Sequence, residues 1–258
     1  ILLSTIVIYM VYEQISEGWK IGKFLVVISL MIMVTANYES VVSVYIFLVF
    51  AIIFLSVIFE PNEWPLKSIM KNGCIYALIL GGGIVGRIVL HKIILAVFKI
   101  PYDVNGNTGI NWEIGKIGDQ VHGLLVDWMD MYLLKSIVYF PLTEIALCSI
   151  IYVGLLIWIF IKIKRGTIWI PGIGMLISLF IMSIILGSII FYRTCQVFAF
   201  FIGFTAMLLY CVVRNLNKRR LNSFVLCGLI WLCLLQAINL NYWLSLNHMR
   251  SEEEGRVI

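Results

Sequence analysis

The chain has 258 residues, of which 62% are hydrophobic and 13% are charged, and its net charge is +5. Soluble domains are about 45–50% apolar and about 25% charged, so this composition excludes an ordinary soluble protein. No segment shows the alternating pattern of a barrel strand, and we therefore predict an all-α fold, a polytopic transmembrane helical bundle. The basic residues lie in short loops, which indicates membrane topology rather than nucleic-acid binding.

Apolar length predicts about eight membrane spans, because a helix needs about 20 apolar residues to cross the hydrocarbon core. In chain order they are 1–12, 24–36, 41–59, 74–98, 142–161, 168–191, 197–213 and 224–246. The chain opens inside an apolar run without a charged leader segment, so we expect Ile1 to lie within a span. Residues 1–258 then form a single transmembrane domain that is truncated at its N-terminus.

Lysine and arginine residues between the spans predict which loops face the cytoplasm. Eleven lie in the loops after the first, third, fifth and seventh spans, against six in the alternate set. The eleven are Lys20, Lys23, Lys67, Lys71, Lys162, Lys164, Arg165, Arg214, Lys218, Arg219 and Arg220. We expect this richer set in the cytoplasm, so Tyr38, Glu39, Arg193, the segment 101–141 and the tail after Leu246 face outward.

The external segment 101–141 contains an amphipathic helix. Between 110 and 134, apolar residues recur at steps of three and four, which is typical of a helix with one apolar face. The stretch is too polar to span the membrane, so we expect an interfacial helix on the outer surface. Asp119, Asp127 and Asp130 fall on its polar side, either as a solvated face or as part of a site.

The predicted span 74–98 holds Gly81, Gly83 and Gly86, which match G-x-G-x-x-G only in form. A dinucleotide-binding turn needs a strand before it and a helix start that faces water. These glycines lie inside an apolar run instead, so they predict close packing between helices.

Arg87 follows in the same span, with His91 and Lys92 beside it. Ionisable groups inside a span are costly and usually face a cavity or a partner. Arg87 either lies near the outer end of the span and extends its side chain to the interface, or binds a lipid phosphate as a bidentate donor.

Three further residues at the predicted outer boundary have two interpretations each. Glu39 is either an acid that stabilises the adjoining helix N-terminus or a site carboxylate. Arg193 stands between two spans with almost no loop, and it either reaches to the interface or binds an anionic donor or product. Arg250 shares one face of a continuing helix with Asn247 and Glu254, either as a solvated helix exit or as part of the site.

Three stretches of the chain together resemble a known family. They are NYESVVSVYI at 37–46, YRTCQVFAFFIGF at 192–204 and NLNYWLSLNHMRSEEE at 239–254. In this order they resemble the Gtr-type glucosyltransferases that decorate bacterial O-antigen, part of lipopolysaccharide. In that family one span opens with a Tyr–Gln-like dipeptide, a later span opens at an Arg, and the last span runs into an acidic helix with Asn and Arg. Here the pair Tyr38–Glu39 stands in place of Tyr–Gln.

The resemblance implies a GT-C membrane glycosyltransferase in the bacterial inner membrane, with its active site on the periplasmic side. It implies a polyprenyl-phosphate sugar as donor, with glucose as the hexose, and a surface polysaccharide as acceptor. It also implies that the main catalytic acid precedes Ile1. Within the chain, we expect Glu39 to be catalytic. We expect donor phosphate or substrate to be bound by Tyr38, Arg193, Arg250, Arg87 and Asp119.

No metal site is predicted, because His122 has no second histidine at ligand spacing. Whether a divalent cation, Mg²⁺ or Mn²⁺, serves as cofactor stays open. The expected partners are the lipid-linked donor, the glycan acceptor and the lipid bilayer, with no nucleic acid.

Two other functions remain open. A surface-polysaccharide polymerase would also have many spans and a large external loop, but its external segments would need arginine, and 101–141 contains none. A transporter or flippase for lipid-linked sugars would favour paired broken spans and charges near the middle of the membrane in both halves. Only the span 74–98 carries charged residues away from its ends.

Overall fold

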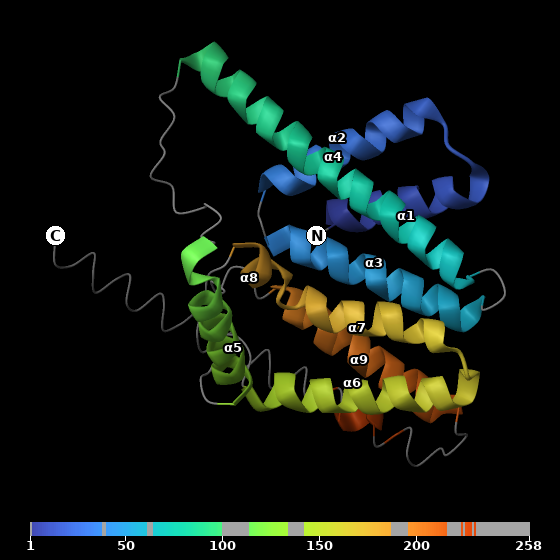
Figure 1. Ribbon diagram of the computed structural model, residues 1–258. Coiled ribbons are helices and arrows are strands. Elements are labelled where there is room, and N and C mark those ends of the chain that lie inside the picture. The colour runs from blue at the N-terminus through green and yellow to red at the C-terminus, as the bar shows by residue number, and fades with distance from the viewer. Residues whose placement is uncertain are drawn as a thin grey trace. The chain divides into compact units, whose positions relative to one another are not determined.

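A computed structural model of the chain describes residues 2–37, 40–60, 64–99, 114–133, 142–186, 196–215, 223, 225–228 and 230. Within these residues the structure is all-helical and contains no strand (Figure 1). The predicted helical fold class is therefore confirmed for the part of the chain that is described.

The described elements are α-helices and two short 3-10 helices. In chain order they are α1 (Leu2–Glu17), α2 (Ile21–Asn37), α3 (Ser40–Phe59), α4 (Leu66–Phe98), η1 (Ile114–Lys116), α5 (Ile117–Leu133), α6 (Leu142–Ile163), η2 (Gly166–Ile168), α7 (Trp169–Ser178), α8 (Ile181–Leu186) and α9 (Gln196–Asn215).

Four of the described helices are long and apolar enough to cross a membrane, which indicates a membrane protein. The four stretches are Val41–Phe59, Leu66–Phe98, Ile145–Ile163 and Val197–Arg214. The apolar helices Ile21–Ala36 and Gly166–Ser178 are shorter. Four candidates do not amount to the predicted eight spans, which stay a prediction, and most of 224–246 lies outside the described residues.

Two helices differ from the sequence prediction. Helix α4 begins at Leu66 instead of residue 74, and its 33 residues extend about 50 Å, well beyond the roughly 30 Å hydrocarbon core. The stretch predicted as one span over 168–191 is not one continuous helix, because the chain turns at Leu179 and Phe180 between α7 and α8. There the backbone N–H groups bond three residues back instead of four, which tightens the helix and breaks its course. The span itself stays a prediction, and 187–191 lie outside the described residues.

The predicted interfacial helix is present as α5, which follows the short η1 turn. Asp119 stands in its first turn, where the helix dipole favours a negative charge. Its location at the membrane surface remains a prediction.

The chain divides into two compact units, 1–124 with 160–201 and 125–159 with 202–258. In the first unit α3 is the central helix and contacts α1, α2, α4, α7 and α8 (Figure 1). Its side chains Val44, Phe47, Phe54 and Val57 are fully buried. The ring of Phe47 meets that of Phe201 edge to face, with centroids 6.4 Å apart, a geometry that aromatic pairs prefer.

In the second unit, α6 carries one buried stripe. Ile145, Cys148, Tyr152, Leu156 and Ile159 are buried and recur at steps of three and four. This spacing places them along one face of the helix, as expected for a helix that packs on one side.

Helices α2 and α4 cross where α4 has glycines. A Cβ atom at Gly83 would lie 2.5 Å from Met31 Cγ and 3.1 Å from the Met31 carbonyl carbon. A Cβ atom at Gly86 would lie 2.5 Å from Ile32 Cδ1. The predicted packing role is confirmed for these two glycines, whereas a Cβ at Gly81 would meet nothing within 4 Å. Small residues thus allow the two backbones to approach closely.

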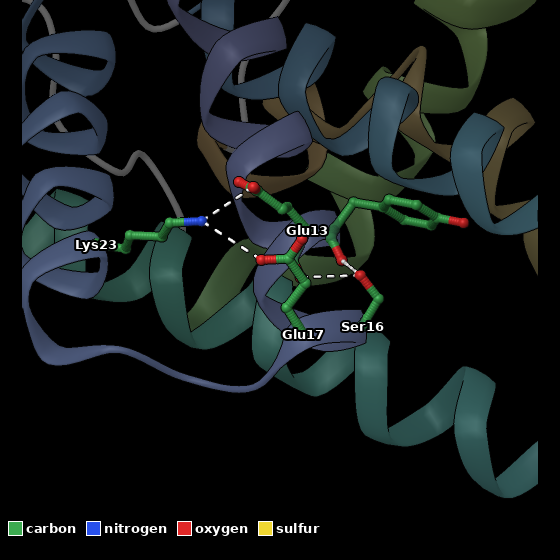
Figure 2. Close-up of polar contacts among 5 residues, drawn as sticks. Glu13, Ser16, Glu17 and Lys23 are labelled. Atoms are coloured by element: carbon green, nitrogen blue, oxygen red, sulfur yellow. Dashed lines mark hydrogen bonds and ion pairs between the residues drawn. The ribbon is translucent and has the colours of Figure 1, made fainter.

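An ion pair closes the turn between α1 and α2 (Figure 2). Lys23 Nζ lies 2.9 Å from Glu13 Oε1 and 3.7 Å from Glu17 Oε2. The hydrogen bond to Glu13 raises the pKa of Lys23 above its ordinary value, and the negative charges of both carboxylates act in the same direction. Because all three side chains are partly exposed, solvent screens the pair, and we expect it to stabilise the turn only weakly.

Candidate functional site

Two of the six residues that the sequence predicts for the site are described. Arg87 is half-buried on α4, and Asp119 is exposed on α5. Neither side chain forms an ion pair with another described residue. The other four, Tyr38, Glu39, Arg193 and Arg250, lie outside the described residues.

Arg87 lies among exposed residues of α4. The apolar side chains before and after it, Val85 and Ile88, are exposed, and so are the basic residues His91 and Lys92 one turn further on. A guanidinium among exposed apolar and basic side chains can extend from the helix towards a surrounding bilayer. This arrangement suits a charged group that meets the head of a membrane lipid.

The length of α4 separates its basic residues into two groups. Lys67 and Lys71 stand near its start, and Arg87 follows Lys67 by 20 residues, or about 30 Å of helix. This is about the thickness of the hydrocarbon core. The two groups are therefore spaced to lie at opposite boundaries of a bilayer.

The end of α2 lies against α4 just before Arg87. The Thr35 hydroxyl lies 3.2 Å from the Gly83 carbonyl oxygen of α4, and 3.0 and 3.1 Å from the Met31 and Ile32 carbonyl oxygens of its own helix. Its single proton is shared among these three acceptors. Arg87 is one helical turn beyond Gly83, so the crossing brings the C-terminal end of α2 towards the basic part of α4.

An apolar groove runs between α3, α4 and α7, all within the first unit. It consists of two adjoining hollows of about 210 and about 320 Å³, which share Phe50, Ile53, Gly73 and Ala77 as lining residues. The smaller hollow is also lined by Ile69, Met70, Cys74, Ile170 and Pro171. The larger one is also lined by Tyr45, Ile46, Val49, Tyr76, Leu80, Gly174, Ile177, Ser178 and Ile181.

The few polar groups of the apolar groove are mostly bonded to backbone. The Tyr45 hydroxyl donates to the Tyr76 carbonyl oxygen (3.2 Å), and Ser178 Oγ donates to the Met175 carbonyl oxygen (2.6 Å). The Tyr76 hydroxyl is buried and has no hydrogen-bond partner among the described residues. With so few free polar groups, the apolar groove favours an apolar occupant over ordered water.

Sequence reasoning missed the apolar groove and also the buried polar groups of α1. Ser4 and Gln14 are fully buried on the face of α1 that also carries Val7 and Val11, and their side-chain polar atoms find no partner in the described part of the chain. The only signal in the sequence was that Ser4 and Gln14 have the helical spacing of the apolar face that includes Val7 and Val11. That pattern does not reveal what the side chain meets.

The described residues contain no group of three or more His, Cys, Asp or Glu side chains that could hold a metal ion. Comparison with family models, with curated proteins and with solved structures found no match to this chain. Over the described residues the fold defines a class: an all-helical membrane protein in which four helices are long and apolar enough to cross a membrane.

Proposed function

We propose that the protein is a membrane glycosyltransferase. It transfers a hexose, glucose by the resemblance, from a polyprenyl-phosphate sugar to a surface polysaccharide such as O-antigen on the outer face of the bacterial inner membrane. The four apolar helices are compatible with a bilayer environment for such a donor. The sequence resemblance motivates the choice of reaction.

The observation that carries the proposal is the approach of Thr35 to Gly83. Contacts advance in the same direction along both helices, because a Cβ at Gly82 would meet Ile28 and one at Gly86 would meet Ile32. Beyond the crossing, Glu39 follows Thr35 by four residues and Arg87 follows Gly83 by four residues. The crossing puts Arg87 one helical turn beyond the contact with Thr35, and we infer that this is the boundary at which the sequence predicts Glu39.

Hexose transfer needs such a pair of charges. A carboxylate takes the proton of the acceptor hydroxyl as its oxygen attacks the anomeric carbon. The bond from that carbon to the lipid phosphate breaks, and a cation stabilises the negative charge that develops on the leaving phosphate. We assign the first role to Glu39, together with the acid expected before Ile1, and the second to Arg87.

The remaining predicted residues complete this proposal. Arg193 and Arg250 would add cations for the phosphate, while Tyr38 and Asp119 would hydrogen-bond to the sugar or to the acceptor hydroxyls. The exposed apolar residues beside Arg87 would let a polyprenyl chain approach from the lipid. The sugar head would then meet the polar layer while its chain stays in the bilayer.

The test is the mass of the surface-glycan repeat unit in cells with and without the full-length gene. We expect one hexose per repeat to be lost without the gene, at unchanged chain length. An unchanged repeat overturns the proposal. In that event shortened chains would indicate a polymerase, and lipid-linked units retained inside would indicate a flippase.

The residue assignments are tested by single variants at equal membrane levels. Glu39→Gln, Arg87→Gln and Arg193→Ala should each lower hexose transfer about 100-fold or more, as expected for loss of a base or of a charge-stabilising donor. Lys20→Gln removes an exposed cation at the α1–α2 turn and should leave transfer unchanged. Normal transfer by Arg87→Gln would remove the role assigned to Arg87.

A further inference from the structure

The apolar groove has one basic end. At this end the smaller hollow is lined by Ile69 and Met70 of α4 and by Ile170 and Pro171 of α7. The chain segments at this end are 66–75, which starts α4, and 161–170, which leads into α7. These two segments hold five cations and no acid. The cations are Lys67, Lys71, Lys162, Lys164 and Arg165. In the sequence, the described acid nearest to these segments is Glu60, which directly follows α3.

The apolar groove is also open along its length to the outside of the helix bundle. Met70 and Ile170 are 56% and 40% exposed, and Cys74, Ala77 and Ile177 are exposed as well. A Cβ atom at Gly73 would meet nothing within 4 Å, so the middle of the groove has room beside the backbone of α4. A flexible chain in the bilayer could therefore enter from the side.

Its dimensions match one leaflet of a membrane. From Ile69 to Leu80 the apolar groove follows 11 residues of α4, or about 16 Å, which is about half of the roughly 30 Å hydrocarbon core. The larger hollow, about 320 Å³, falls within the range of about 300–1,000 Å³ that ligand sites occupy.

We propose that the apolar groove binds one acyl chain of an anionic phospholipid whose phosphate pairs with the basic end. Lys67 and Lys71 are the exposed cations of α4 that meet the head group, and the acyl chain lies along Gly73 and Ala77 towards Leu80. Charge complementarity selects the anionic lipid, since juxtamembrane lysines attract anionic head groups. The site lies at the end of α4 opposite Arg87 and does not rest on the proposed transferase activity.

The experiment uses the full chain in nanodiscs that contain phosphatidylcholine and a trace of phosphatidylglycerol with a photoreactive group midway along one acyl chain. After illumination, mass spectrometry locates the labelled peptides. We expect label within 66–81 and 169–181, the α4 and α7 walls of the apolar groove. A probe with a phosphatidylcholine head and the same chain should label these peptides at least about tenfold less.

Substitutions along α4 test the contact with the acyl chain. A Cβ atom at Gly73 meets nothing within 4 Å, so Gly73→Leu should place its side chain in the middle of the groove and lower labelling by phosphatidylglycerol about tenfold or more. Gly81→Leu on the same helix also meets open space but does not line the groove, so it is the matched control. Ala77→Phe is a second blocking variant in case Gly73→Leu alters the fold.

The charge test compares two double variants. Lys67→Gln with Lys71→Gln should reduce the preference for phosphatidylglycerol over phosphatidylcholine by roughly tenfold. Lys20→Gln with Lys99→Gln removes two exposed cations elsewhere in the same unit and should preserve the preference. Equal labelling by phosphatidylglycerol and phosphatidylcholine would overturn the proposal, and so would full labelling of both Gly73→Leu and Ala77→Phe. A polyprenyl-phosphate probe that labels the groove more strongly than phosphatidylglycerol would also overturn it.

Discussion

The Thr35 hydroxyl of α2 lies 3.2 Å from the Gly83 carbonyl oxygen of α4, at a crossing where a Cβ atom on Gly83 would lie 2.5 Å from Met31 Cγ. The contact of the Thr35 hydroxyl with Gly83 depends on the glycine, because the hydroxyl reaches the opposing backbone only where the helices approach closely. Small residues and hydrogen bonds of this kind hold helices together in membranes, where hydrophobic burial provides no driving force between them.

We expect Thr35→Val to destabilise the α2–α4 crossing modestly, by about 0.6 kcal/mol. Valine keeps the shape of threonine but loses the donor, and the hydroxyl already shares its proton with two carbonyls of its own helix. Thermal unfolding in detergent measures the change. Thr5→Val on α1 is a control for the general effect of the exchange, and an equal loss there would remove the special role of Thr35.

Substitution of Gly83 tests how closely the helices pack. Gly83→Ala forces the new methyl group against the backbone and side chain of Met31, and such overpacking costs about 1–3 kcal/mol. Gly81→Ala meets open space and should stabilise α4 by up to about 1 kcal/mol, because alanine favours helix. Unfolding in detergent should therefore rank Gly81→Ala above the parent chain and Gly83→Ala below it. The reverse order would contradict the crossing.

The two buried tyrosines of the apolar groove should respond differently to loss of the hydroxyl. Tyr45→Phe removes the donor to the Tyr76 carbonyl and should cost about 1 kcal/mol. Tyr76→Phe removes a buried hydroxyl that has no described partner, so it should be neutral or stabilising. Both variants are compared by thermal unfolding in the same detergent. A larger loss for Tyr76→Phe would indicate that its hydroxyl binds a group outside the described residues.

The ion pair at the α1–α2 turn predicts a dependence on alkaline pH. The pKa of Lys23 is raised in the folded chain, so its stabilising effect is complete below the unfolded lysine pKa of about 10.4 and is lost as the pH rises through the folded value. Glu13→Gln removes the carboxylate that mainly raises the pKa of Lys23, so the variant should lower this pKa. An NMR titration of the Lys23 side chain measures this shift. Glu17→Gln, whose carboxylate is further away, should lower it less.

Much of the helical content was predictable because apolar length is a local property. The predicted stretches 24–36, 41–59, 142–161 and 197–213 each lie inside an observed helix. The break at Leu179 and Phe180 was not predicted, since that run is uniformly apolar and its hydropathy does not register a local change in backbone hydrogen bonding. The start of α4 was placed too late because polar residues such as Lys67 and Lys71 lowered the apolar signal of its first turns.

The candidate site was less predictable. Arg87 stood out as a charge inside an apolar run, but nothing in its neighbours indicated that the end of α2 lies beside it. The apolar groove gave no signal at all, because Gly73, Ala77 and Gly174 are ordinary residues of apolar helices. They line a hollow only because α3, α4 and α7 come together around them.

The sequence by itself determined the class of the protein: apolar runs of bilayer length, broken by short basic loops, are stable only as helices in a membrane. It also determined that the glycines of α4 would permit close packing. The tertiary structure decided which helices pack closely at these glycines, because helix pairing depends on contacts between residues far apart in the chain. It set Gly83 against Met31 and left Gly81 open, and it assembled the apolar groove from three separate helices.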